Sequence, residues 1–123
     1  MKKSLLLLSL FVWSPSAISE PIDSVKLLSF CKLTLSNDES LPHTGEDFVK
    51  AGLCLGIISG VNGVNQLLAE NGQTPIYCPD EGIKYADLVE VVIAFLKREG
   101  SKYNFDATLS VLQAFTQQFP CKG

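Results

Sequence analysis

The sequence has few of the residues on which enzymes and nucleic-acid-binding proteins depend. His43 is the only histidine, and the 10 lysines and arginines are outnumbered by 13 aspartates and glutamates. A nucleophilic triad needs a base, and a nucleic-acid-binding protein needs a basic face. Four carboxylates lie close together, at Asp80, Glu81, Asp87 and Glu90, but helix-start charge and a solvated helix face explain them. We therefore expect no enzyme activity, no catalytic residue and no cofactor.

The N-terminal apolar run is too short to cross a membrane. Residues 5–13 are apolar except for a serine, whereas a membrane span needs about twenty apolar residues. Lys2 and Lys3 precede this run, and Ala17 and Ser19 place small residues before a cut ahead of residue 20. This pattern predicts a cleaved secretory signal peptide over residues 1–19.

Removal of that segment leaves residues 20–123, enough for one domain, and changes the net charge from −3 to −5. All four cysteines remain, and an even count in a small exported chain predicts two disulfides. Zinc is the rival, but no two cysteines have close metal-ligand spacing, so we expect no metal. The sequence permits three pairings. We expect Cys31–Cys121 and Cys54–Cys78, with Cys31–Cys54 and Cys78–Cys121 as the alternative.

Helical periodicity dominates the mature chain and predicts an all-α fold, a compact bundle of about four helices with two disulfides. The first helix is expected over about residues 22–34, and the second begins after Thr44 and includes the uncharged stretch 51–69. A third helix carries its apolar face from Tyr85 to residue 96. The fourth is expected to be capped by Asn104 or Ser101. Its predicted core face is Phe105, Leu109, Leu112, Phe115 and Phe119.

Gly52, Gly56 and Gly60 recur every four residues and so line one side of the second helix. Missing side chains there would let another helix approach closely, and we expect a helix contact at this ridge. A membrane span is the alternative for residues 51–69. The polar amides at positions 62, 65 and 66 and the four glycines in this stretch argue against it.

Three short motifs occur in a fixed order: Gly-Leu-Cys-Leu-Gly at 52–56, Tyr-Cys-Pro at 77–79 and Phe-Pro-Cys at 119–121. Together they resemble the Tai-type family of type VI secretion amidase immunity proteins. The likeness covers roughly residues 31–121. The chain departs from the family pattern at Ile57, where an aromatic residue is frequent, and at Lys84, where threonine or serine often caps the next helix.

The resemblance implies a periplasmic protein, often a homodimer, that occludes the active-site groove of a peptidoglycan amidase. A loop between helices can enter a groove that is too narrow for a helix, so we expect the partner-binding residues there. They are Glu99, Ser101, Lys102, Tyr103 and Asn104. An ordinary connector is an equally simple interpretation of that loop. The alternative functions are a periplasmic stress chaperone and, less well supported, a small hydrolase. No nucleic acid, and no membrane after signal cleavage, is expected as a partner.

Overall fold

The computed structural model describes residues 20–35, 44–100, 102 and 104–122, and these residues form four helices and no strand. The helices are α1 (Ser24–Thr34), α2 (Gly45–Glu70), α3 (Tyr85–Glu99) and α4 (Ala107–Gln118). The expected all-α bundle is confirmed. The expected signal peptide and most of the expected loop after α1, including His43, lie outside the described residues.

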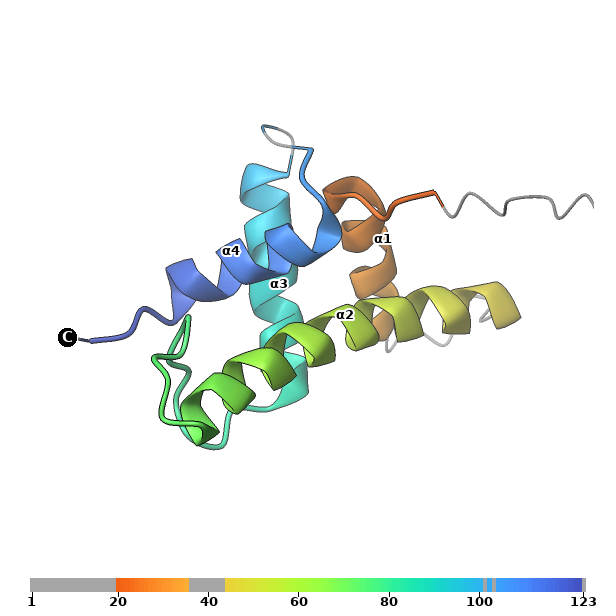
Figure 1. The fold of residues 1–123 in the computed structure, drawn as a ribbon. Coiled ribbons are helices and arrows are strands. Elements are labelled where there is room, and N and C mark those ends of the chain that lie inside the picture. The colour runs from red at the N-terminus through yellow and green to blue at the C-terminus, as the bar shows by residue number, and fades with distance from the viewer. Residues whose placement is uncertain (1–19, 36–43, 101, 103, 123) are drawn as a thin grey trace, which may run out of the picture.

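The long helix α2 runs along one side of the molecule (Figure 1). Helix α1 packs against α2 and α3, and α4 packs against α3 and α2. The core between them is formed by buried residues from every helix and from the connection between α2 and α3. Its largest fully buried side chains include Leu27, Ile58, Tyr77, Leu88 and Phe115. Helix α3 contributes the most, because six of its residues are buried along one face.

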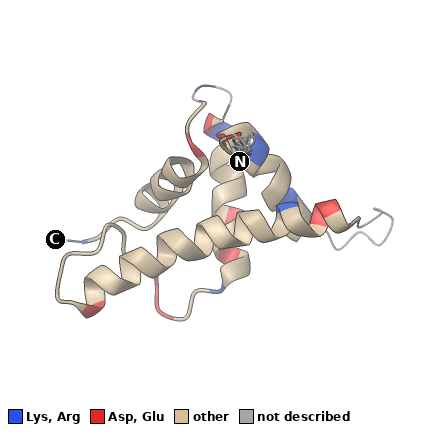
Figure 2. Ribbon diagram, turned by 45° about the vertical axis from the view of Figure 1, so that its right-hand side comes forward, with Lys and Arg blue, Asp and Glu red and all other residues tan. Residues whose placement is uncertain are grey.

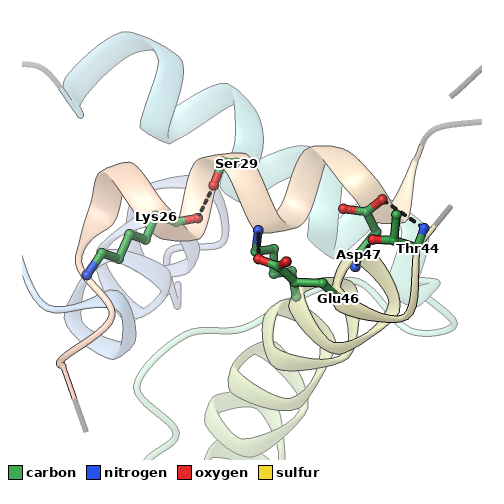
Figure 3. A network of polar contacts seen from close by, with 6 residues as sticks. Lys26, Ser29, Thr44, Glu46 and Asp47 are labelled. Carbon is green, nitrogen blue, oxygen red and sulfur yellow. Dashed lines mark hydrogen bonds and ion pairs between the residues drawn. The ribbon is translucent and has the colours of Figure 1, made fainter. Parts of the chain in front are cut away.

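The helix starts follow local capping chemistry. At α2, the Thr44 side chain accepts a hydrogen bond from the Asp47 N–H (3.2 Å), and the Asp47 carboxylate accepts one from the Thr44 N–H (3.1 Å), as Figure 3 shows. This reciprocal pair is a capping box. At α3, the Asp87 carboxylate accepts from the Lys84 N–H (3.2 Å), so this helix starts without a serine or threonine cap.

Helix α4 starts later than the sequence predicts. Its cap is Asp106, whose carboxylate accepts from the Thr108 N–H (2.9 Å), so the expectation of Asn104 or Ser101 was wrong. The backbone explains the shift. The Ser24 N–H donates to the Phe105 carbonyl and the Ala107 N–H to the Ile22 carbonyl, both at 2.9 Å. These bonds hold the chain beside the start of α1, and the helix begins at Ala107, the last residue that takes part in them.

The later start also rotates the buried face of α4. Of the five predicted core residues only Phe115 is fully buried, and Leu109 is 52% exposed. The buried residues of this helix are Ala107, Ser110, Val111, Ala114 and Phe115. The predicted face was wrong at Leu109, whereas Phe115 is buried and Leu112 and Phe119 pack, partly buried, against the core. The predicted face included Phe105, a residue that precedes the helix.

The disulfides pair in the order that we considered second. The structure contains Cys31–Cys54 and Cys78–Cys121, so the expected Cys31–Cys121 and Cys54–Cys78 were wrong. Cys31 and Cys54 meet because α1 packs along the first half of α2, where both are fully buried. The chain end cannot reach α1, because it lies beside the α2–α3 connection, where the Cys78 N–H donates to the Phe119 carbonyl (2.8 Å).

Candidate partner-binding surfaces

The loop between α3 and α4 lies at the end of the molecule away from α2 (Figure 1). Of the five predicted partner-binding residues, Ser101 and Tyr103 lie outside the described residues. Lys102 and Asn104 are exposed, and Glu99 is partly buried. The Lys102 N–H donates to the Glu99 carbonyl (2.9 Å), which forms a turn directly after α3.

Charged side chains cluster at the first half of this loop. The Glu99 carboxylate lies 3.2 Å from Arg98 Nε and 3.8 Å from Lys102 Nζ. The second half is fixed to α1, where the Ser24 hydroxyl lies 3.5 Å from the Asn104 side-chain oxygen, in addition to the two backbone bonds at residues 22–24. The loop therefore leaves the body of the protein from two anchored ends.

A second surface follows the outward side of α2. Six residues are exposed at alternating spacings of four and three: Val49, Leu53, Gly56, Gly60, Gly63 and Leu67. This spacing places them in one row along a helix. We call this row the outer stripe. Its three large hydrophobic residues are 41–63% exposed.

The glycines of α2 do not contact another helix among the described residues, so the expected internal helix contact was wrong. A Cβ atom added at Gly52, Gly56 or Gly60 would meet nothing within 4 Å. Helix α2 is also long and apolar enough, by length and composition, to cross a membrane, and only 17% of its most apolar 18-residue stretch is buried. Between its charged ends it carries no charge, as its tan colour in Figure 2 shows. The described part of the chain thus leaves a long apolar helix face uncovered.

The opposite side of α2 holds polar residues that the sequence interpretation used only against a membrane span. Asn65 is 5% exposed, and its side-chain oxygen accepts from the Ile76 N–H (2.7 Å) and the Tyr77 N–H (3.2 Å). Its side-chain nitrogen donates to the Tyr77 carbonyl (2.9 Å). One carboxamide therefore fixes the α2–α3 connection. The sequence signal was the pair of amides at a spacing of three, Asn62 and Asn65, within an otherwise apolar helix.

The candidate reactive groups among the described residues are the cysteines, the acidic groups and a buried phenol. All four cysteines are in disulfides, and no group of His, Cys, Asp and Glu within the described ranges could hold a metal ion. Tyr77 is fully buried, and burial raises its pKa to about 12, with a smaller contribution from Tyr85. A phenol that is protonated at neutral pH and enclosed in the core serves as a hydrogen-bond donor.

Comparison with known proteins gives a family match over most of the chain. A family model described as Rap1a immunity proteins matches residues 23–121. No curated protein and no solved structure matches the chain.

Proposed function

The chain belongs to the Rap1a immunity proteins, and on that basis we propose that it binds and blocks a peptidoglycan amidase delivered by type VI secretion. The family is one of type VI secretion immunity proteins, and the match over residues 23–121 is the observation that carries the proposal. The N-terminal segment typical of a secretory signal and the two disulfides support a periplasmic location, because disulfides persist in oxidising compartments.

The α3–α4 loop is the element that we propose to enter the enzyme's groove. Lys102 and Asn104 of the loop are exposed, and its two ends are anchored to α3 and α1. An anchored loop loses less conformational freedom on binding than a free one, so more of its contact energy appears as affinity. Lys102 provides an exposed charge at its centre.

Calorimetry with peptidoglycan amidases of the type VI secretion effector class tests the proposal. We expect a stable, nearly stoichiometric complex, and replacement of Ser101, Lys102 and Tyr103 together by alanine should weaken binding at least tenfold, since a central anchor contributes about 2 kcal/mol or more. Lys32→Ala, which removes an exposed lysine from α1, is the matched control and should bind as the wild type does.

Full affinity of the triple variant would remove the loop from the mechanism, and no binding to any amidase would remove the function. The chaperone alternative predicts a different result, because a chaperone would suppress the aggregation of many unrelated proteins. Measuring the light scattering of heated client proteins separates the two.

The proposed partners also include a second copy of this chain, packed on the outer stripe. The stripe is self-complementary when two α2 helices cross in antiparallel orientation about a two-fold axis near residue 58. That register sets Val49 opposite Leu67, Leu53 opposite Gly63, and Gly56 opposite Gly60 of the second copy. In a two-fold interface each contact occurs twice. Leu53 of each copy would cover Gly63 of the other, the large residues Val49 and Leu67 would pair at both ends, and the two backbones would approach closely at the central glycines.

A second copy fits the stripe better than a lipid surface does. Helices that lie on membranes are rich in lysine and arginine on their polar side. Helix α2 has one, Lys50, whose ammonium pairs with Glu46 at 2.6 Å, against three acidic residues. A dimer on this face would also leave both α3–α4 loops directed away from the interface (Figure 1).

Light scattering coupled to size-exclusion chromatography tests this arrangement. Wild-type protein should elute as a dimer, and Gly56→Glu should weaken dimerisation at least tenfold, because it brings two carboxylates into an apolar contact. Leu55→Glu places the same charge on another side of α2 and should remain dimeric. A monomeric wild type, or a dimeric Gly56→Glu variant, would contradict the proposal, and co-sedimentation of the wild type with lipid vesicles would assign the stripe to a membrane instead.

A further inference from the structure

A hollow of about 580 Å³ lies between the second half of α2 and the connection formed by residues 71–84. Apolar wall residues include Pro75 and Ile83, and the rim carries Asp80 and Glu81. The α2 residues that line it lie on a different side of the helix from the outer stripe. The proposed dimer therefore leaves this hollow open.

The hollow is held in shape before any partner arrives. Asn65 fixes the connection through its three hydrogen bonds to residues 76 and 77. The Cys78–Cys121 disulfide ties the same connection to the chain end. A preformed surface loses little freedom on binding, so modest contacts can give measurable affinity.

A half-satisfied amide lies at the inner wall. Asn62 is 8% exposed, and its side-chain oxygen accepts from the hydroxyl of the fully buried Tyr77 (3.3 Å). Its side-chain nitrogen has no hydrogen-bond partner among the described residues. Buried N–H donors are normally paired, so this nitrogen offers a donor to a carbonyl oxygen that enters the hollow.

The rim of the hollow carries two negative charges. Asp80 and Glu81 are exposed, and neither carboxylate forms an ion pair within the part of the chain that the structure describes. No lysine or arginine is among the described residues that line the hollow. The connection carries red segments beside the tan body of α2 in Figure 2. The rim therefore attracts positive charge.

We propose that this hollow binds a basic segment of a partner protein. A backbone carbonyl of that segment accepts from the Asn62 side-chain nitrogen, and an arginine side chain lies along Ile83 and reaches the carboxylates of Asp80 and Glu81. Arginine fits best, because its planar guanidinium can donate to two carboxylates at once while its methylene stem covers apolar surface. The inference rests on the proposed function only for the identity of the partner, which would then be the effector.

The test is an NMR titration of the oxidised, ¹⁵N-labelled protein with acetyl-Gly-Arg-Gly-amide and, as the neutral match, acetyl-Gly-Gln-Gly-amide. The arginine peptide should shift the Asn62 side-chain resonances and the amides of residues 81–83 in a saturable manner. It should bind at least threefold more tightly than the glutamine peptide. The paired variant Asp80→Asn with Glu81→Gln should lose that preference, because the rim carboxylates carry it.

Glu46→Gln with Glu90→Gln changes the net charge by the same amount at exposed positions away from the hollow and is the matched control, which should keep the preference. Equal binding of the two peptides, shifts confined to another surface, or an unchanged preference in the rim variant would overturn the inference. No effector is needed for this titration. Failure of the peptide to bind the hollow would therefore not contradict the proposed function. Failure of the protein to bind an amidase would likewise not contradict peptide binding in the hollow.

Discussion

At the scale of single residues, two buried asparagines connect α2 to the segment that follows it. The Asn65 side chain supplies hydrogen-bond partners to the backbone of residues 76 and 77, and the Asn62 side-chain oxygen accepts a hydrogen bond from the Tyr77 hydroxyl. Sequence reasoning saw these residues only as obstacles to a membrane span. It could not assign their partners, because residues 76 and 77 reach α2 through a turn at Gly72, where φ is +69°. Glycine adopts this conformation more readily than any other residue.

Asn65→Ala should lower the free energy of unfolding by roughly 2–4 kcal/mol, because it leaves two backbone N–H groups and one carbonyl of the connection without their partner. Asn71→Ala is the control, since its side chain makes one exposed bond to the Leu67 carbonyl (2.8 Å), and it should cost less than about 1 kcal/mol. Urea denaturation measures both. Equal losses would show that the Asn65 bonds do not hold the connection.

The buried phenol of Tyr77 predicts a loss of stability at high pH. Its pKa is raised to about 12 from an ordinary value of 10, so the unfolded chain releases this proton at lower pH than the folded one. The contribution of this pKa shift to the free energy of unfolding is complete below pH 10 and is lost as pH rises from 10 towards 12. Absorbance titration at 295 nm should show one tyrosine that ionises near pH 12, and Tyr77→Phe should remove that step. An unchanged titration in the variant would contradict the burial argument.

At the scale of elements, the sequence predicted the helices well and their contacts less well. Periodicity predicted four helices, and the Thr44 signal marked the start of α2 correctly. The start of α4 was missed because a backbone pairing with residues 22–24 displaced it. The glycine ridge was placed inside the fold because a row of small residues permits close contact with another helix. The sequence does not show whether that helix belongs to the same chain or to another molecule.

Two glycine substitutions of the same size should have opposite effects. Gly56→Ala should raise the free energy of unfolding by roughly 0.5–1 kcal/mol in dilute protein, because alanine favours helix and the added methyl group meets nothing within 4 Å. Gly100→Ala should cost roughly 1–3 kcal/mol, because its Cβ atom would clash with the Leu96 carbonyl oxygen. Thermal and urea unfolding at low concentration measure both changes. A destabilised Gly56→Ala monomer would mean that the ridge is packed within the chain.

At the scale of the whole molecule, the sequence predicted an all-helical chain with two disulfides. It also predicted a resemblance to type VI secretion immunity proteins, which the Rap1a match supports. It did not predict which cysteines meet. Pairing depends on how α1, α2 and the chain end lie in space, and the hydrophobic pattern of each helix fixes only which of its sides is buried. The outer stripe and the hollow likewise depend on the assembled fold. Both are surfaces of α2 whose exposure is set by how the other helices and the α2–α3 connection pack against it.

The two disulfides should differ in their resistance to reduction. Cys31 and Cys54 are fully buried between α1 and α2, whereas Cys78 and Cys121 are exposed beside the chain end. Thiol–disulfide exchange requires a thiolate to reach a sulfur atom, so mild reductant should open Cys78–Cys121 at least tenfold faster. The bonds span sequence separations of 23 and 43 residues, and each contributes at most roughly 3–4 kcal/mol in the chain-entropy model.

Timed alkylation followed by peptide mapping measures this order. Loss of Cys78–Cys121 should release the chain end and loosen the connection that Asn65 holds, while α1 and α2 stay joined. The same reaction in concentrated urea is the control, because unfolding exposes both bonds and their rates should then converge. Earlier opening of Cys31–Cys54 in the folded protein, or recovery of a Cys31–Cys121 peptide, would show that α1 and α2 are not packed as described.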